Sequence, residues 1–127
     1  MTQIDPILGA MDSASSGMSA QSLRLRLATE NLSNADTPGY QRKLATFRAE
    51  AGGVELGRVF LDKKEGTSLY DPAHPLADEN GVVMMSNVNM LIEMADARQA
   101  GRGYDANLQV FAQARRLYDG LLGILKR

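Results

Sequence analysis

Apolar residues recur along the first part of the chain with the spacing of an amphipathic helix. Four large apolar side chains lie seven residues apart, at Met11, Met18, Leu25 and Leu32. Apolar residues also stand four positions before three of them, at Ile7, Ala14 and Ala28, which completes a heptad pattern. The pattern predicts a helix from residue 6 to about residue 34, with Asp5 as its cap and Pro6 in its first turn. Pro38–Gly39 ends the segment, because the residue before a proline resists helical geometry.

The last part of the chain carries a longer apolar stripe. Its members follow alternating steps of three and four residues, at Met90, Met94, Ala97, Gly101, Tyr104, Leu108, Phe111, Tyr118, Leu122 and Leu125. The spacing predicts a second helix over residues 89–127, capped by Asn89. Gly101 and Gly103 mark either a flexible point in this helix or a place where another helix approaches closely.

Residues 40–86 have a different character. Short β-prone runs occur at 44–47, 54–56, 59–61 and 82–85, separated by glycine-, proline- and asparagine-containing turns. They predict a small β-rich insert of two to four strands. The expected fold is therefore mainly α, with long N- and C-terminal helices packing as a coiled-coil-like pair and a β-hairpin insert between them. We expect one structural domain in three parts, residues 1–39, 40–86 and 87–127.

Two such stripes pose an energetic question. The conformational entropy lost on ordering a long helix is of the same order as the free energy gained by burying one apolar stripe. Serine and glycine residues between positions 13 and 22 weaken the first helix further. Two arrangements remain open on this reasoning: the stripes pack on each other in a stand-alone helical hairpin, or neighbouring subunits cover them and order both chain ends on assembly.

The composition of the chain excludes several classes of function. With 127 residues the chain has the length of a single domain, and its 14 basic and 15 acidic side chains are balanced. No large positive field indicates nucleic acid or an anionic membrane as a partner. The absence of cysteine excludes disulfides and thiol chemistry, and no apolar run is long enough to span a bilayer. The first basic residue is Arg24, so a secretory signal of the usual kind is not expected either.

Candidate chemistry is sparse. His74 is the one histidine, and its position between Pro72 and Pro75 favours a role in bracing a turn over catalysis. Asp78–Gly81 is similar to part of a calcium loop but lacks the later bidentate glutamate, which favours a β-turn. We therefore predict no catalytic, cofactor-binding or metal-binding residues, and no cofactor.

A mild basic cluster is formed by Arg24, Arg26, Arg42, Lys43 and Arg48. We interpret it as a solvated face, or as partners for acidic neighbours, in preference to a nucleic-acid site.

The segment after the first helix resembles the flagellar rod, hook and hook-associated family, which has the signature A-x-N-x-x-N-x-x-T-P-G-Y. The matching residues are Asn31, Asn34, Thr37, Pro38, Gly39 and Tyr40, with Thr29 in the alanine position. Two further motifs resemble those of a proximal-rod member of the family, Y-D-P-x-H-P-x-A-D-x-x-G-Y-V and N-V-N-x-x-x-E-M. The residues that carry them are Asp71, Pro72, His74, Pro75, Asn87, Val88 and Asn89. Val82 and Ser86 depart from the usual aromatic and proline, which affects local geometry only.

The resemblance implies a structural subunit of the bacterial flagellar basal body that is not an enzyme. Such a subunit would self-assemble through its terminal helices into the proximal rod, the drive shaft that transmits torque and encloses the export channel. It would cross the periplasm after leaving the cell through the flagellar type III export apparatus. The expected subunit-interface residues are Met11, Met18, Leu25, Leu32, Met90, Met94, Tyr104, Leu108, Phe111, Tyr118, Leu122 and Leu125.

Expected partners are other proximal rod proteins, the rod–membrane-ring adaptor, distal rod proteins and the export apparatus, with no nucleic acid and no membrane insertion. The alternatives are a sister proximal-rod protein, a soluble helical adaptor or export chaperone, and a small hydrolase. The hydrolase would need clustered titratable residues, and the sequence does not indicate that Asp62, Asp71 and Asp78 converge.

Overall fold

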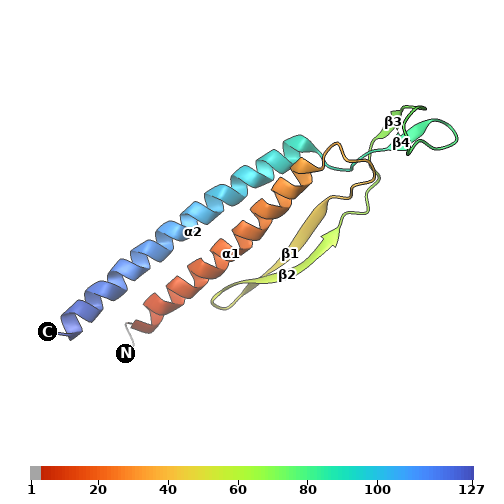
Figure 1. Cartoon of the computed structure of the whole chain (residues 1–127). Helices are drawn as coiled ribbons and strands as arrows, with labels where there is room; N and C mark the ends of the chain where they lie inside the picture. Colours follow the sequence, from red (N-terminus) through yellow and green to blue (C-terminus); the bar gives the residue numbers. More distant parts are fainter. Residues whose placement is uncertain (1–3) are drawn as a thin grey trace. The chain divides into compact units, whose positions relative to one another are not determined.

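The computed structural model describes residues 4–127, which form two long helices and four short strands (Figure 1). In chain order the elements are α1 (Ile4–Ser33), β1 (Lys43–Glu50), β2 (Gly53–Leu61), β3 (Ser68–Tyr70), β4 (Val82–Met84) and α2 (Met90–Leu125). The predicted fold class, two long terminal helices with a small β insert between them, is confirmed. One detail differs: α1 already includes Ile4, so Asp5 lies within its first turn and does not cap it. An acidic side chain still suits that position, which is the positive end of the helix dipole.

The insert consists of two separate two-stranded sheets, β1–β2 and β3–β4. The predicted runs at 54–56 and 59–61 join into the single strand β2. In the second sheet, β3 and β4 are antiparallel, with Leu69 opposite Val83. The sequence analysis did not predict β3, because its three residues are all exposed and show no apolar alternation.

The described residues form two compact units. The first combines residues 4–23, 46–58 and 99–127, and the second combines residues 24–45 and 59–98. Both helices therefore contribute to both units. Neither helix has a stretch of residues 4–127 that is long and apolar enough to cross a membrane.

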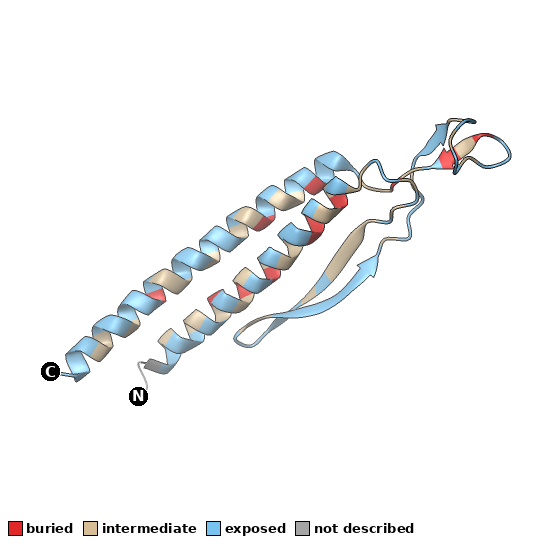
Figure 2. Ribbon diagram, viewed as in Figure 1, coloured by how far each residue is buried: buried red, intermediate tan, exposed pale blue. Residues whose placement is uncertain are grey.

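In the first unit, α1 lies antiparallel beside α2, and small residues make the contact (Figure 1). A Cβ atom added at Gly17 would be 2.6 Å from Oδ1 of Asn107, and one added at Gly103 would be 2.8 Å from Cδ of Gln21. Gly103 is thus a point of close helix approach, as the sequence suggested, whereas a Cβ at Gly101 would meet no atom within 4 Å. The buried apolar residues of this unit are all alanines, Ala14, Ala20, Ala100 and Ala114 (Figure 2).

The β1–β2 hairpin is tied to α1 in the same unit. Ser16 Oγ accepts a hydrogen bond from the Val54 N–H (3.0 Å) and donates one to the Ser13 carbonyl (2.8 Å). Gly53 next to this contact has φ of 147°, and a Cβ there would be 2.2 Å from Ser16 Oγ. Glycine at position 53 therefore permits both the turn and the close approach of the strand to the helix.

The second unit has a small core in which polar side chains take a large share. Its buried residues other than glycine are Leu27, Ala28, Asn31, Val83, Ser86 and Glu93. Buried polar groups persist in folded proteins when they are hydrogen-bonded, and their partners define the site described next.

Candidate functional site

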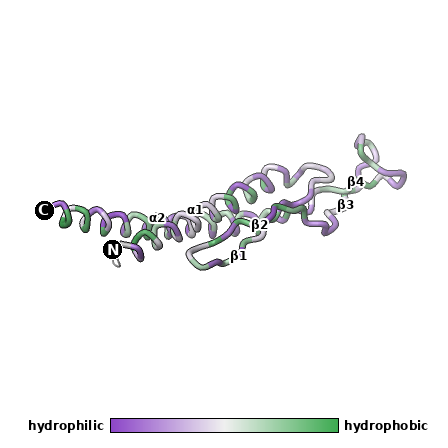
Figure 3. Tube along the Cα trace, turned by 90° about the horizontal axis from the view of Figure 1, so that it is seen from below, coloured by the Kyte–Doolittle hydropathy of each residue, from purple (hydrophilic) through white to green (hydrophobic). Residues whose placement is uncertain are grey.

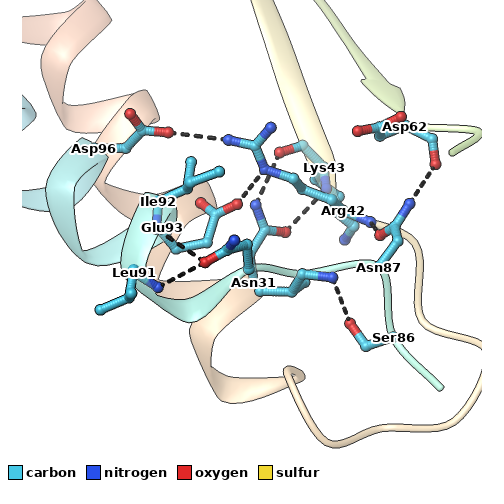
Figure 4. A network of polar contacts seen from close by, with 12 residues as sticks. Asn31, Arg42, Lys43, Asp62, Ser86, Asn87, Leu91, Ile92, Glu93 and Asp96 are labelled. Atoms are coloured by element: carbon cyan, nitrogen blue, oxygen red, sulfur yellow. Dashed lines mark hydrogen bonds and ion pairs between the residues drawn. The ribbon is translucent and has the colours of Figure 1, made fainter. Parts of the chain in front are cut away.

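Asn31, the first asparagine of the family signature, is buried at the end of α1 and fixes the reversal of the chain. Its side-chain oxygen accepts hydrogen bonds from the Tyr40 hydroxyl (2.9 Å) and the Lys43 N–H (2.9 Å). Its amide nitrogen donates to the Lys43 carbonyl (3.0 Å; Figure 4). One side chain thereby joins the last turn of α1 to the start of β1.

The rest of the signature forms the loop after α1. Asn34 donates to the Glu30 carbonyl (2.9 Å) and accepts from the Thr37 hydroxyl (3.1 Å), so it satisfies a carbonyl at the helix end. Gly39 has φ of 75°, a left-handed conformation that favours glycine, and its N–H donates to the Met84 carbonyl (3.0 Å). The loop between Asn34 and Tyr40 is thus held at both ends.

Asn87 connects three backbone segments within the second unit. It accepts from the Arg42 N–H (2.6 Å) and donates to the carbonyls of Asp62 (2.9 Å) and Lys64 (2.8 Å). Two positions on, Asn89 caps α2 as predicted, accepting from the Leu91 N–H at 3.0 Å. The asparagines of the N-V-N motif therefore fix the chain at the point where the insert ends and α2 begins.

Arg42 completes this arrangement with an ion pair to a buried acid. Its guanidinium Nε pairs with Glu93, and its Nη2 lies 3.0 Å from Asp96 Oδ2 (Figure 4). A buried carboxylate needs such a partner because desolvation of an unpaired charge is costly. We call Asn31, Tyr40, Arg42, Lys43, Asn87, Glu93 and Asp96 the polar network.

Two groups of the polar network have shifted pKa values. Burial, and secondarily the Glu30 carboxylate, raise the pKa of the Tyr40 phenol above its usual value near 10. The ammonium group of Lys43 forms a hydrogen bond and ion pair with Glu30, and this hydrogen bond raises the pKa of Lys43. Both shifts favour the protonated forms, so Tyr40 remains a neutral hydrogen-bond donor to Asn31 at neutral pH.

The predicted partners of the basic cluster are confirmed for three of its members. Arg42 pairs with Glu93 and Asp96, Lys43 with Glu30, and Arg48 with Glu50 and Glu55. The interpretation that these cations neutralise acidic neighbours thus holds for them.

The segment Asp71–Pro75 forms a turn, as predicted. The His74 N–H donates to the Asp71 carbonyl (3.1 Å), and His74 Nδ1 accepts from the Leu76 N–H (3.0 Å). Pro72 lies against Gly81, where a Cβ would be 2.9 Å from its ring. His74 therefore braces the turn.

The segment at Asp78 is also a turn. Its carboxylate accepts from the N–H groups of Asn80 (2.8 Å) and Val82 (2.9 Å). Within residues 4–127, no three histidine, aspartate or glutamate side chains form a group that could hold a metal ion.

None of the twelve residues predicted as subunit contacts is fully buried in the single chain. Six are half-buried: Met11, Met18, Leu32, Phe111, Tyr118 and Leu122. The other six are exposed: Leu25, Met90, Met94, Tyr104, Leu108 and Leu125. The buried residues of the two helices are mostly small, and Ala14 and Ala28 of the first heptad pattern are among them.

Sequence reasoning missed the partners of the polar network and one apolar face of α2. No local signal in the sequence linked Glu93 to Arg42, 51 residues away. A further apolar series with heptad spacing, beginning at Ala106, was visible in the sequence but was not recognised beside the longer stripe.

Comparison with known proteins gives consistent matches. A family model described as "Flagella basal body rod protein" matches residues 11–41, and one described as "Flagellar basal body rod FlgEFG protein C-terminal" matches residues 79–124. The chain is 46% identical to the flagellar basal-body rod protein FlgC of Agrobacterium fabrum, over 97% of this chain and 98% of that relative. It is 37% identical to FlgC of Salmonella typhimurium, over 82% and 87% of the two chains, and 32% identical to FlgC of Aquifex aeolicus, over 89% and 92%.

Proposed function

This chain belongs to the family of the flagellar basal-body rod proteins FlgC, and from that premise we propose how it works within the rod. It is a structural subunit of the flagellar basal-body rod. In our proposal the subunit occupies the proximal rod and self-assembles through its terminal helices. The assembled helices form the drive shaft that transmits motor torque and encloses the export channel.

The observation that carries this proposal is the exposure of large apolar side chains along both helices. Leu25 on α1 and Leu91, Leu108 and Leu125 on α2 are all exposed in the single chain. Burying one such side chain stabilises a complex by about 1.5–3 kcal/mol. A helix with apolar residues on more than one face is typically covered on more than one face, so neighbouring subunits are the natural cover for α2.

The polar network is consistent with a role in a rigid shaft that transmits torque. It uses directional hydrogen bonds and the Arg42–Glu93 ion pair to hold the end of α1, the ends of the hairpin and the start of α2 together. Because interiors are close-packed, bending an assembly of such subunits would break many contacts at once. We propose that this network keeps the base of the insert rigid in the rod.

Several further points belong to the same proposal. The partners are other proximal rod proteins, the rod–membrane-ring adaptor and distal rod proteins, and the chain passes through the flagellar type III export apparatus to reach the periplasm. The role is mechanical and involves no catalysis, no nucleic acid and no membrane insertion. His74 Nδ1 and Asp78 Oδ1 accept hydrogen bonds from backbone N–H groups of their own turns, which supports a structural role for both residues.

The experiment replaces Leu108 in a flagellated strain whose own copy has been deleted. Because Leu108 is exposed in the single chain, Leu108→Asp should leave expression intact and abolish rod assembly and swimming. Leu108→Met is the matched control and should swim normally. Normal swimming of the Leu108→Asp strain would refute assembly through this helix, and absence of the wild-type chain from purified basal bodies would favour a soluble adaptor.

A further inference from the structure

The C-terminal half of α2 carries a second apolar stripe that the single chain leaves uncovered. Val110, Leu117 and Ile124 lie seven residues apart and are 52%, 54% and 66% exposed. Ala106, Gln113 and Gly120 alternate with them in steps of three and four residues. This is the repeat that places one side of a helix against a partner helix. We call these six residues the outer stripe. Hydrophobic and hydrophilic colours alternate along α2 (Figure 3).

Four residues of the outer stripe, Ala106, Val110, Gln113 and Leu117, line an open groove in the first unit. Together with Ala10 of α1 and their neighbours on α2 they border a volume of about 920 Å³, and most of the lining atoms are apolar. Arg116 stands at the edge of the groove and donates to Gln113 (2.9 Å). Arg102 occupies the same heptad position two repeats earlier and is also exposed. The groove therefore combines large apolar side chains with a basic edge.

The outward face of α1 has the opposite properties. Its acidic residues lie near the start of the helix, and residues with small side chains follow them. Its exposed residues follow steps of three and four, at Asp5, Leu8, Asp12, Ser15, Ser19 and Ser22. Small side chains allow another helix to approach closely, since the distance between packed helices depends on the side chains at the contact.

We propose that the groove beside the outer stripe receives the outward face of α1 from a second copy of this chain. This inference rests on the proposed function and adds which helix of which subunit covers this side of α2. Val110 and Leu117 would pack against the serine positions of the second copy. Asp12 of that copy would face Arg116, as flanking charges do in paired helices.

The charges and side-chain sizes of α2 also argue against α2 of the second copy as the helix that fills the groove. Residues 99–127 carry five basic and two acidic side chains, whereas residues 4–23 carry two acidic side chains and no basic one. Two α2 segments side by side would bring like charges together and oppose large residues to large residues. The pairing of α1 with α2 avoids both conflicts.

Disulfide trapping between copies tests the proposal directly, because the natural chain has no cysteine. A strain would express two variants together, one with Ser15→Cys or Ser22→Cys and the other with Val110→Cys or Leu117→Cys. After mild oxidation of purified basal bodies, mass spectrometry would identify the linked peptides. We expect disulfides that join an α1 cysteine of one copy to an α2 cysteine of another.

Charge variants extend the test. Arg116→Glu in the copy that carries Leu117→Cys should reduce the yield of this disulfide, and Asp12→Arg in the other copy should restore it. Arg58→Glu is the control, because it makes the same charge change at an exposed residue of β2, outside the helices, and should leave the yield unchanged.

Each other outcome overturns the proposal. Disulfides formed only between two α2 cysteines would show that α2 of the second copy fills the groove. Both variants present in basal bodies without any disulfide between copies would show that another rod protein covers the outer stripe. Absence of even the wild-type chain from basal bodies would instead refute the proposed function itself.

Discussion

Arg42 and Glu93 form an ion pair although they lie 51 residues apart in the sequence, and Glu93 is only 1% exposed. The pair joins the segment just before β1 to the first turn of α2. The N–H groups of Arg42 and Lys43 donate hydrogen bonds to the side-chain oxygens of Asn87 and Asn31, which holds the backbone at Arg42 in place. The carboxylate thus depends on a guanidinium whose position two asparagines fix.

Removal of the guanidinium should be costly. Arg42→Met leaves Glu93 buried without its cation, and breaking a buried pair in this way typically costs about 3–5 kcal/mol of the free energy of unfolding. Urea unfolding followed by circular dichroism measures the loss. Arg48→Met is the matched control, since Arg48 pairs with Glu50 and Glu55 at the surface and should contribute at most about 1 kcal/mol. Similar losses for the two variants would contradict the role of the pair.

Asn31→Ala should destabilise the end of α1 by about 1–3 kcal/mol, because it removes the acceptor of Tyr40 and both side-chain contacts to the Lys43 backbone. Faster amide hydrogen exchange at Lys43 would report this locally. Asn80→Ala, an exposed asparagine in a turn, serves as the comparison and should change exchange at Lys43 little. Unchanged exchange in Asn31→Ala would refute the assignment.

Alkaline pH should weaken the second unit through Tyr40. Its pKa is raised in the folded chain, so the phenol loses its proton more readily when the chain is unfolded. The stability contributed by the neutral phenol is therefore complete below about pH 10 and is lost as pH rises through the folded pKa. The raised pKa of Lys43 acts in the same direction.

The prediction is that Tyr40→Phe loses about 0.5–1.5 kcal/mol at neutral pH, the contribution of one hydrogen bond, and declines less steeply above pH 10. Tyr70→Phe, at an exposed tyrosine, should follow the wild-type curve. A Tyr40→Phe curve parallel to that of the wild type would show that this phenol does not set the alkaline limit.

The close contact between the helices predicts a contrast between two glycines of α1. Gly17→Leu should disturb the helix pair, since even a Cβ there would lie 2.6 Å from Asn107, and overpacking costs about 1–3 kcal/mol. Gly9→Leu should be tolerated or slightly stabilising, because a Cβ at Gly9 meets nothing within 4 Å and leucine favours helix. Thermal unfolding compares the two, and equal effects would contradict the contact at Gly17.

The sequence predicted the helices well because their periodicity extends over many turns, but it did not predict which of the periodic residues are buried. Heptad reasoning placed Ala14 and Ala28 in one stripe with the large side chains at Met11, Met18 and Leu25, and of these five residues only the two alanines are buried. In the single chain the closest contact uses Gly17 and the neighbouring alanines, because small residues let the two backbones approach. Large residues then lie at the edges, where a periodic pattern alone does not distinguish a contact within one chain from a contact between chains.

The polar network shows a different limit. The motifs identified Asn31, Tyr40 and Asn87 as residues of interest and gave Asn89 its capping role, since a cap depends only on the next turn of chain. The partners of Asn31 and Asn87 lie 9 to 45 residues away, and no local propensity encodes such pairings. The same reason explains why the ion pair between Arg42 and Glu93 was found only in three dimensions.

The most direct test of the central claim is an electron cryo-microscopy map of isolated basal bodies at side-chain resolution. The account predicts that the apolar residues exposed on α2 of one chain, Leu108, Leu117 and Ile124 among them, are buried against helices of neighbouring subunits. A rod in which these side chains face solvent, with the subunits joined only through residues 40–86, would contradict it.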